Sequence, residues 1–110
     1  MELSRHCGIA KDLLSLKRFS NPTGSLEAWE RLFVAKGLKE TCGIEQYPGF
    51  GVEKIYKARV VPLGENIGKS KGYRLIFRLV GEGLYQILVF SRHGLYSNER
   101  DLVRIIKDRL

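Results

Sequence analysis

The sequence has little of what marks a secreted, fibrous or membrane-spanning chain. Its two cysteines, Cys7 and Cys42, lie far apart, form no C-x-x-C pair and have no histidine at ligand spacing, so we expect reduced thiols and no metal site. Three prolines and the lack of low-complexity segments exclude collagen-like and disordered chains. No apolar run approaches the roughly 18 residues that a membrane span requires. The first residues lead into no apolar stretch, so we expect no secretory signal, no membrane partner and a cytoplasmic location.

What is present fits one compact domain with an uneven charge. The 110 residues include 44% apolar and 28% charged residues, ordinary values for a single globular domain spanning 1–110. The net charge is +7, and the segment 52–78 alone holds seven basic and two acidic residues, a net charge of +5. Such a concentrated positive field favours a polyanionic partner, nucleic acid above all. The alternative is a basic surface that only keeps the protein soluble.

The N-terminal half has the apolar spacing of helices. Apolar residues recur at three- and four-residue intervals over 7–19, and again from Leu26 to Gly37, after the turn-forming segment 21–25. We expect Ser25 or Asn21 to cap the second helix, and Trp29 and Phe33 to anchor the core.

The second half alternates with the period of strands. The pattern predicts strands over 52–61, 73–79 and 84–91, with a hairpin turn at 81–83, and a final helix that Ser97 could cap. The predicted fold class is therefore α+β, with two N-terminal helices packed on a small antiparallel sheet and a short C-terminal helix.

The alternation also predicts a basic strip on one face of the sheet. Lys57 and Arg59 point away from the aromatic core, and so do Arg74 and Arg78 on the neighbouring strand. Further basic residues are expected at the rim and at the end of the next strand: Lys69, Lys71, Arg92 and His93. Like charges on one sheet face destabilise it unless an anion fills the space, so the strip predicts phosphate binding.

Three segments carry a resemblance to a known family. They are 57–62 (KARVVP), 68–77 (GKSKGYRLIF) and 87–92 (ILVFSR). Together they resemble the RelE/ParE superfamily of bacterial and archaeal toxins, in particular its RelE- and HigB-like branch. The resemblance covers roughly residues 50–106, while the N-terminal helices match only in size and placement.

The resemblance implies a toxin of a type II toxin–antitoxin system. Such a toxin has a RelE-like fold, cleaves messenger RNA on the ribosome without a metal or other cofactor, and is neutralised by a small cognate antitoxin. By position, Arg59 matches a lysine or arginine that family members use near the scissile phosphate, and Arg74 matches the arginine after the family's glycine–aromatic pair. Lys57 is the neighbouring base of the same strand, and Arg92 or His93 would follow the last strand. These five are the expected catalytic residues. The expected RNA-binding residues are Lys54, Lys69, Lys71 and Arg78.

The chemistry is compatible with these residue types. Attack by a ribose 2′-hydroxyl builds negative charge on the phosphoryl oxygens, which preorganised cations stabilise. The 2′-hydroxyl must lose a proton and the leaving 5′-oxygen must gain one. His93, Tyr96 and a lysine crowded by other cations, such as Lys57, are the candidates for these transfers. No paired carboxylate and histidine stand out in the sequence.

Two other functions stay open from the sequence. A ParE-like inhibitor of DNA gyrase shares the fold and acts by binding rather than cleavage. The set of Lys57, Arg59, Arg74 and Arg92 favours the nuclease, since ParE-like members generally lack it. A non-catalytic relative that only binds nucleic acid or an antitoxin is the third reading.

Overall fold

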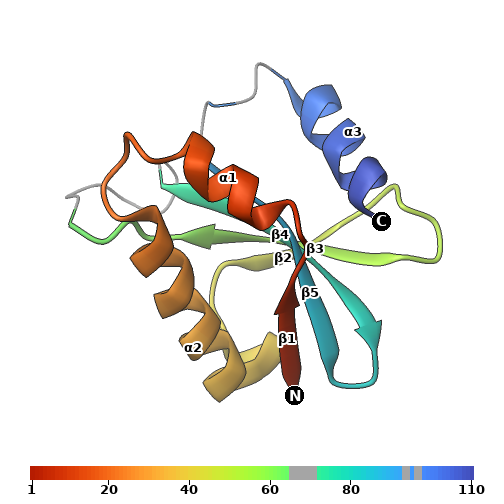
Figure 1. Ribbon diagram of the computed structural model, residues 1–110. Helices are drawn as coiled ribbons and strands as arrows, with labels where there is room; N and C mark the ends of the chain where they lie inside the picture. Colours follow the sequence, from red (N-terminus) through yellow and green to blue (C-terminus); the bar gives the residue numbers. More distant parts are fainter. Residues whose placement is uncertain (65–71, 93–94, 96–97) are drawn as a thin grey trace.

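The computed structural model describes residues 1–64, 72–92, 95 and 98–110. Within these residues, three helices and five strands follow one another, and Figure 1 shows their arrangement. They are β1 (Glu2–Arg5), α1 (Ile9–Ser15), α2 (Pro22–Glu40), β2 (Ile44–Tyr47), β3 (Lys54–Val60), β4 (Tyr73–Gly81), β5 (Leu84–Arg92) and α3 (Glu99–Arg109). Among the described residues, no helix has both the length and the apolar character needed to cross a membrane.

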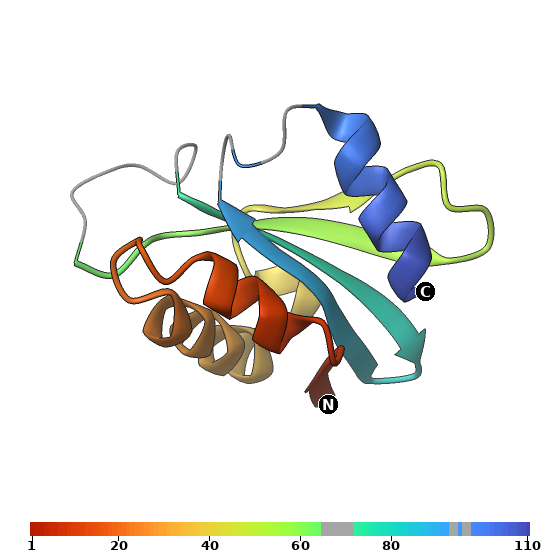
Figure 2. The same cartoon turned by 45° about the horizontal axis from the view of Figure 1, so that its top comes forward.

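The five strands form one mixed sheet in the order β1-β5-β4-β3-β2. β1 pairs with β5 in parallel, and the other neighbours are antiparallel. Figure 2 shows α1 and α2 on one side of the sheet and α3 on the other. The α+β class is confirmed, whereas the purely antiparallel sheet and the helical start of the chain are wrong. The four residues of β1 are too few to show a period, and they become a strand only by pairing with β5.

The helix ends follow local sequence signals. Asn21 caps α2, because its side-chain oxygen accepts a hydrogen bond from the Gly24 N–H at 3.0 Å, and Pro22 opens the helix. We expected the helix to stop at Gly37. The backbone of Gly37 is indeed non-helical, with a φ of 81°, but α2 continues beyond this kink to Glu40. Asn98 caps α3 by accepting from the Asp101 N–H at 3.1 Å; the expected cap, Ser97, lies outside the described residues.

Two apolar cores lie on the two faces of the sheet. The core under α1 and α2 is aromatic: the rings of Trp29 and Phe33 stack with centroids 4.9 Å apart, and Phe77 packs against both, which confirms both anchors. The buried residues of the core under α3 are aliphatic, and they include Ile76 of β4 and Leu102 of α3. The sheet face expected to stand open to an anion is therefore partly covered by a helix.

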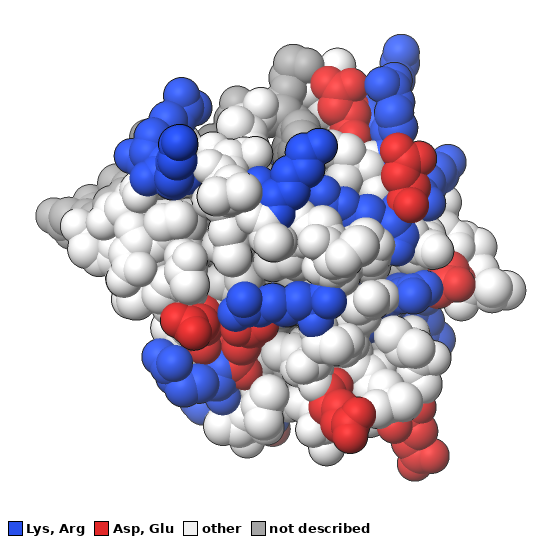
Figure 3. Space-filling view, in the orientation of Figure 1, with Lys and Arg blue, Asp and Glu red and all other residues white. Residues whose placement is uncertain are grey.

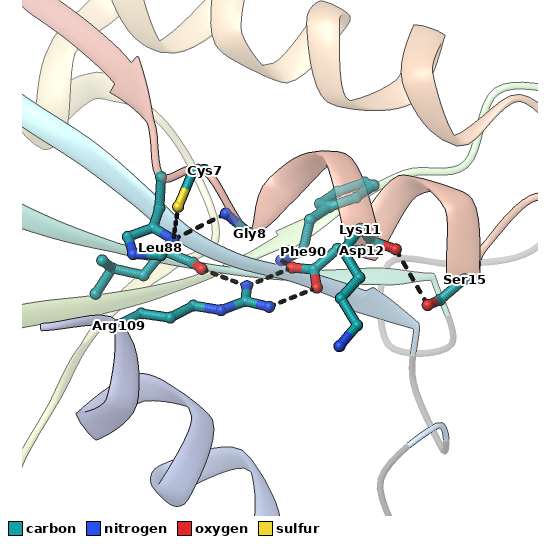
Figure 4. A network of polar contacts seen from close by, with 9 residues as sticks. Cys7, Gly8, Lys11, Asp12, Ser15, Leu88, Phe90 and Arg109 are labelled. Atoms are coloured by element: carbon teal, nitrogen blue, oxygen red, sulfur yellow. Dashed lines mark hydrogen bonds and ion pairs between the residues drawn. The ribbon is translucent and has the colours of Figure 1, made fainter.

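A buried ion pair joins α1, β5 and α3, as Figure 4 shows. The Asp12 carboxylate accepts hydrogen bonds from Arg109 Nη1 at 2.7 Å and Nη2 at 2.9 Å, and from the Phe90 N–H at 2.9 Å. Arg109 Nη1 also donates to the Leu88 carbonyl at 2.7 Å. β1 pairs with β5 only as far as Ile87. Asp12 and Arg109 therefore bond to backbone groups of β5 beyond that point, where β1 no longer pairs with it.

Candidate nucleic-acid interface

Strand pairing brings four cations to the sheet face that α3 covers. We call Lys57, Arg59, Arg74 and Arg78 the basic face. Arg59 lies directly opposite Arg74 across β3 and β4, while Lys57 lies opposite Ile76, which belongs to the α3-side core. The structure therefore places these four predicted side chains on one face of the sheet, where Arg74 contacts the first turn of α3.

Carboxylates of the same chain already pair with most of the basic face. Three of its four cations form ion pairs, whereas Arg59 forms none with any described residue. The pairs are Lys57 Nζ with Glu45 Oε2 at 3.6 Å, Arg74 Nη2 with Glu99 Oε1 at 3.0 Å, and Arg78 Nη1 with Glu53 Oε2 at 3.8 Å. The argument that like charges on this face require an external anion is thus wrong, because the protein supplies its own. In Figure 3, basic and acidic side chains lie interspersed on the side of the molecule seen there.

Glu99, in the first turn of α3, bridges two residues of the sheet. It accepts hydrogen bonds from Arg74 on β4 and from the Tyr47 hydroxyl on β2. These bonds, that from Tyr47 first, hold the pKa of Glu99 below its usual value. Burial, and then the bond to Glu99, raises the pKa of Tyr47 to about 12. Lys57 Nζ lies 5.5 Å from the centroid of the Tyr47 ring, so the hydroxyl, the carboxylate and two cations share one small region.

Arg92 lies on the opposite face, which corrects the prediction that it closes the same groove. Its guanidinium carbon is 4.6 Å from the centroid of the Phe19 ring and 5.0 Å from that of Tyr73, in the aromatic core under α1 and α2. The cause is a register shift in β5: Ile76 pairs with Val89, but the next residue, Phe77, pairs with Ile87. The extra residue on β5 reverses the alternation of every side chain after it.

Lys54, the remaining predicted residue that the structure describes, does not join the basic face. Lys54 opens β3 at an exposed position, and the alternation turns it to the face of Tyr56 and Ala58, under α2. His93, Lys69, Lys71 and Tyr96 lie outside the described residues. Among the described residues, no group of three or more His, Cys, Asp or Glu side chains is placed to hold a metal ion.

The chain was compared with protein-family models, curated proteins and solved structures. No match was found in any of the three comparisons. Any functional assignment therefore rests on the geometry of the basic face and on the resemblance of the sequence motifs.

Sequence reasoning missed Glu99, Tyr47 and Glu45. Acidic residues at a helix N-terminus are common, because they interact favourably with the helix dipole, so Glu99 gave no functional signal. Tyr47 and Glu45 lie on β2, a four-residue strand defined only by its pairing with β3. Once that pairing is known, Glu45 is seen to lie directly opposite Lys57.

Proposed function

We propose that this protein is a cytoplasmic toxin of RelE type, a metal-independent endoribonuclease that cleaves messenger RNA on the ribosome and is neutralised by a small antitoxin. The observation that carries the proposal is the direct opposition of Arg59 and Arg74 on neighbouring strands, with Lys57 on the same face. Two helices against one face of the sheet and one against the other would then be the RelE-like arrangement.

The basic face would act on the phosphate of the RNA backbone. The 2′-oxygen attacks phosphorus, the bond to the 5′-oxygen breaks, and a cyclic phosphate and a free 5′-hydroxyl result. Arg59 and Arg74 stabilise the charge that develops on the phosphoryl oxygens. Lys57 and Tyr47 are the described side chains beside them that can move a proton. Lys57, after it has released its own proton to solvent, accepts one from the 2′-hydroxyl, and Tyr47 donates one to the 5′-oxygen.

RNA must displace the carboxylates that now pair with these cations. The side chains of Glu99 and Glu45 are 61% and 64% exposed. Exposed ion pairs contribute only about 0–1 kcal/mol each, so a phosphate can replace a carboxylate with little loss of stability. Because Arg59 pairs with no described carboxylate, it is the first contact available to RNA.

The test is cleavage of messenger RNA in a ribosome-programmed translation extract. Arg74→Ala and Arg59→Ala should each slow cleavage by about a hundredfold or more, the usual effect of removing one such donor. Lys39→Ala, on the exposed side of α2, is the matched control and should cleave as fast as the unaltered protein. Thermal melting should show near-native stability, since surface changes usually stay within about 0.5 kcal/mol. Full cleavage by a folded Arg74→Ala protein would overturn the site assignment.

A function by binding alone is the second candidate. The ion pair between Arg74 and Glu99 and the placement of Arg92 on the opposite face favour it, because both leave fewer cations for the transition state. This candidate predicts that the protein binds ribosomes or RNA in a salt-dependent manner without cutting the message. Mapping of messages after induction in a bacterial host separates the two, since only the nuclease should leave them cut. Growth arrest that the small protein encoded beside it relieves would identify a toxin of either kind.

A further inference from the structure

A groove opens between α2 and the end of β3, at the edge of the sheet where β2 begins. Its volume is about 340 Å³, and we call it the α2–β3 groove. Trp29 and Val60 form its buried wall, and three large apolar side chains lie exposed around it. These three are Leu32, Val61 and Leu63, with exposed fractions of 43%, 44% and 41%.

Apolar side chains gathered around a hollow indicate a binding site, whereas single exposed ones do not. Ligand pockets range over about 300–1,000 Å³, so this groove lies at the small end of the range. It has room for one or two large side chains of a partner, with the exposed rim left for the neighbouring backbone.

The buried wall contains a hydrogen-bond donor without an acceptor. The Trp29 indole Nε1 is buried, and no described residue accepts a hydrogen bond from it. A buried indole N–H normally has a partner, because leaving it unpaired costs about 1–3 kcal/mol. The ring cannot easily turn the N–H outward, because it stacks on Phe33 at 4.9 Å and packs on Phe77. A ligand seated in the groove therefore contacts the apolar ring of Trp29 and not this N–H, which stays closed to the groove.

A peptide segment fits such a groove, because one side chain can fill the hollow while the backbone lies along the exposed rim. The strand pairing favours an extended segment: β2 starts opposite Ala58, so in the described structure Arg59 and Val60 continue β3 with no strand on that side. The charges favour an acidic segment, since Lys36 and Arg59 line the groove against one carboxylate, Glu40, and the chain carries +7 overall.

We propose that the α2–β3 groove binds an extended, acidic segment of a partner protein. The segment inserts one large apolar side chain beside the Trp29 ring and directs carboxylates to Lys36 and Arg59. Occupation of the groove would also cover Arg59, one of the cations of the basic face. Covering Arg59 would inhibit RNA cleavage. This inhibition rests on the proposed function, whereas binding of the segment does not.

The test begins with a display library of random peptides, selected on the full chain. We expect enrichment of peptides in which a large aliphatic or aromatic residue is flanked by Asp or Glu. An enriched peptide, synthesised and titrated into the labelled protein, should shift the single indole N–H resonance, since Trp29 is the only tryptophan. Ala28→Phe fills the groove and should weaken binding by about tenfold or more, as expected for loss of an anchor pocket.

Ala35→Phe is the matched control, since Ala35 is exposed on α2 outside the groove, and it should bind the peptide as the unaltered protein does. Leu32→Glu, at an exposed rim position, covers the case in which Ala28→Phe does not fold, and its added charge should also weaken binding. The proposal is overturned if the peptides show no apolar–acidic pattern, if the indole resonance stays in place, or if the folded groove variants bind as tightly as the control.

This experiment contains no RNA, so its result is separate from the fate of the nuclease proposal. A peptide that binds and moves the Trp29 resonance supports the groove even if the protein cleaves no message. If the protein does cleave, the same peptide should inhibit cleavage by the unaltered chain and leave Ala28→Phe uninhibited. Inhibition of both proteins alike would place the peptide elsewhere.

Discussion

The buried pair between Asp12 and Arg109 allows a stability change to be worked from the structure. In Arg109→Met the aliphatic part of the side chain is largely kept, but Asp12 loses two hydrogen bonds and the Leu88 carbonyl loses one. The side chains of Arg109 and Asp12 are only 14% and 9% exposed, so water replaces these bonds poorly. Removing one partner of a buried pair costs about 3–5 kcal/mol, because it leaves an uncompensated charge. For a domain with a total stability of about 5–15 kcal/mol, this loss is a large fraction.

Urea unfolding followed by the fluorescence of Trp29 measures this change. The matched control is Arg5→Met, which removes the other two-pronged arginine–carboxylate pair, between Arg5 and Glu30 at 2.5 and 2.8 Å. There the arginine side chain is 35% exposed, so we expect a loss of only about 1 kcal/mol or less. The slope of the free energy of unfolding against urea should stay the same in both variants. Equal losses in the two variants, or a loss below about 1 kcal/mol for Arg109→Met, would refute the reasoning about burial.

Three further predictions follow from contacts near the basic face. Glu99→Gln weakens the acceptor that holds Arg74, so it should tighten RNA binding severalfold in a filter-binding assay at low salt; unchanged or weaker binding would contradict the displacement of Glu99 by phosphate. The pKa of Tyr47 is raised to about 12, so the stabilising bond to ionised Glu99 is still complete as the pH approaches 10 and is lost as the pH rises through 12. The tyrosinate absorbance of the unaltered protein minus that of Tyr47→Phe should show this titration, and a midpoint near 10 would exclude it. Gly72→Ala should destabilise the fold by about 1–3 kcal/mol in thermal melting, because the new Cβ would lie 2.6 Å from the Val60 carbonyl oxygen; an unchanged melting temperature would mean that the backbone yields freely there.

Strong local patterns predicted the larger elements. α2 begins at its turn-forming cap, and β3 and β4 begin within two residues of where the alternation predicts strands. The same alternation correctly separated Arg74 from Tyr73, Leu75 and Phe77. These successes share one cause: a long segment with one buried face repeats its period often enough to be read.

Short elements and the second core could not be read in this way. β1 and β2 have four residues each, and both are defined by partners far along the chain. Ile76, which the alternation placed among the cations, is buried because α3 packs on that face. No local pattern states which face of a sheet a terminal helix will cover, since that choice depends on the sheet already being assembled.

The sequence by itself determined that Lys57, Arg59, Arg74 and Arg78 lie on one side of a two-stranded unit, because successive side chains of a strand must point to opposite faces. Only the tertiary structure decided what surrounds them. The packing of α3 brings Glu99 to Arg74, and one extra residue in β5 turns Arg92 to the other face. Both outcomes depend on the register and docking of distant segments, which are set by the free energy of the whole assembled core rather than by the preferences of the residues involved.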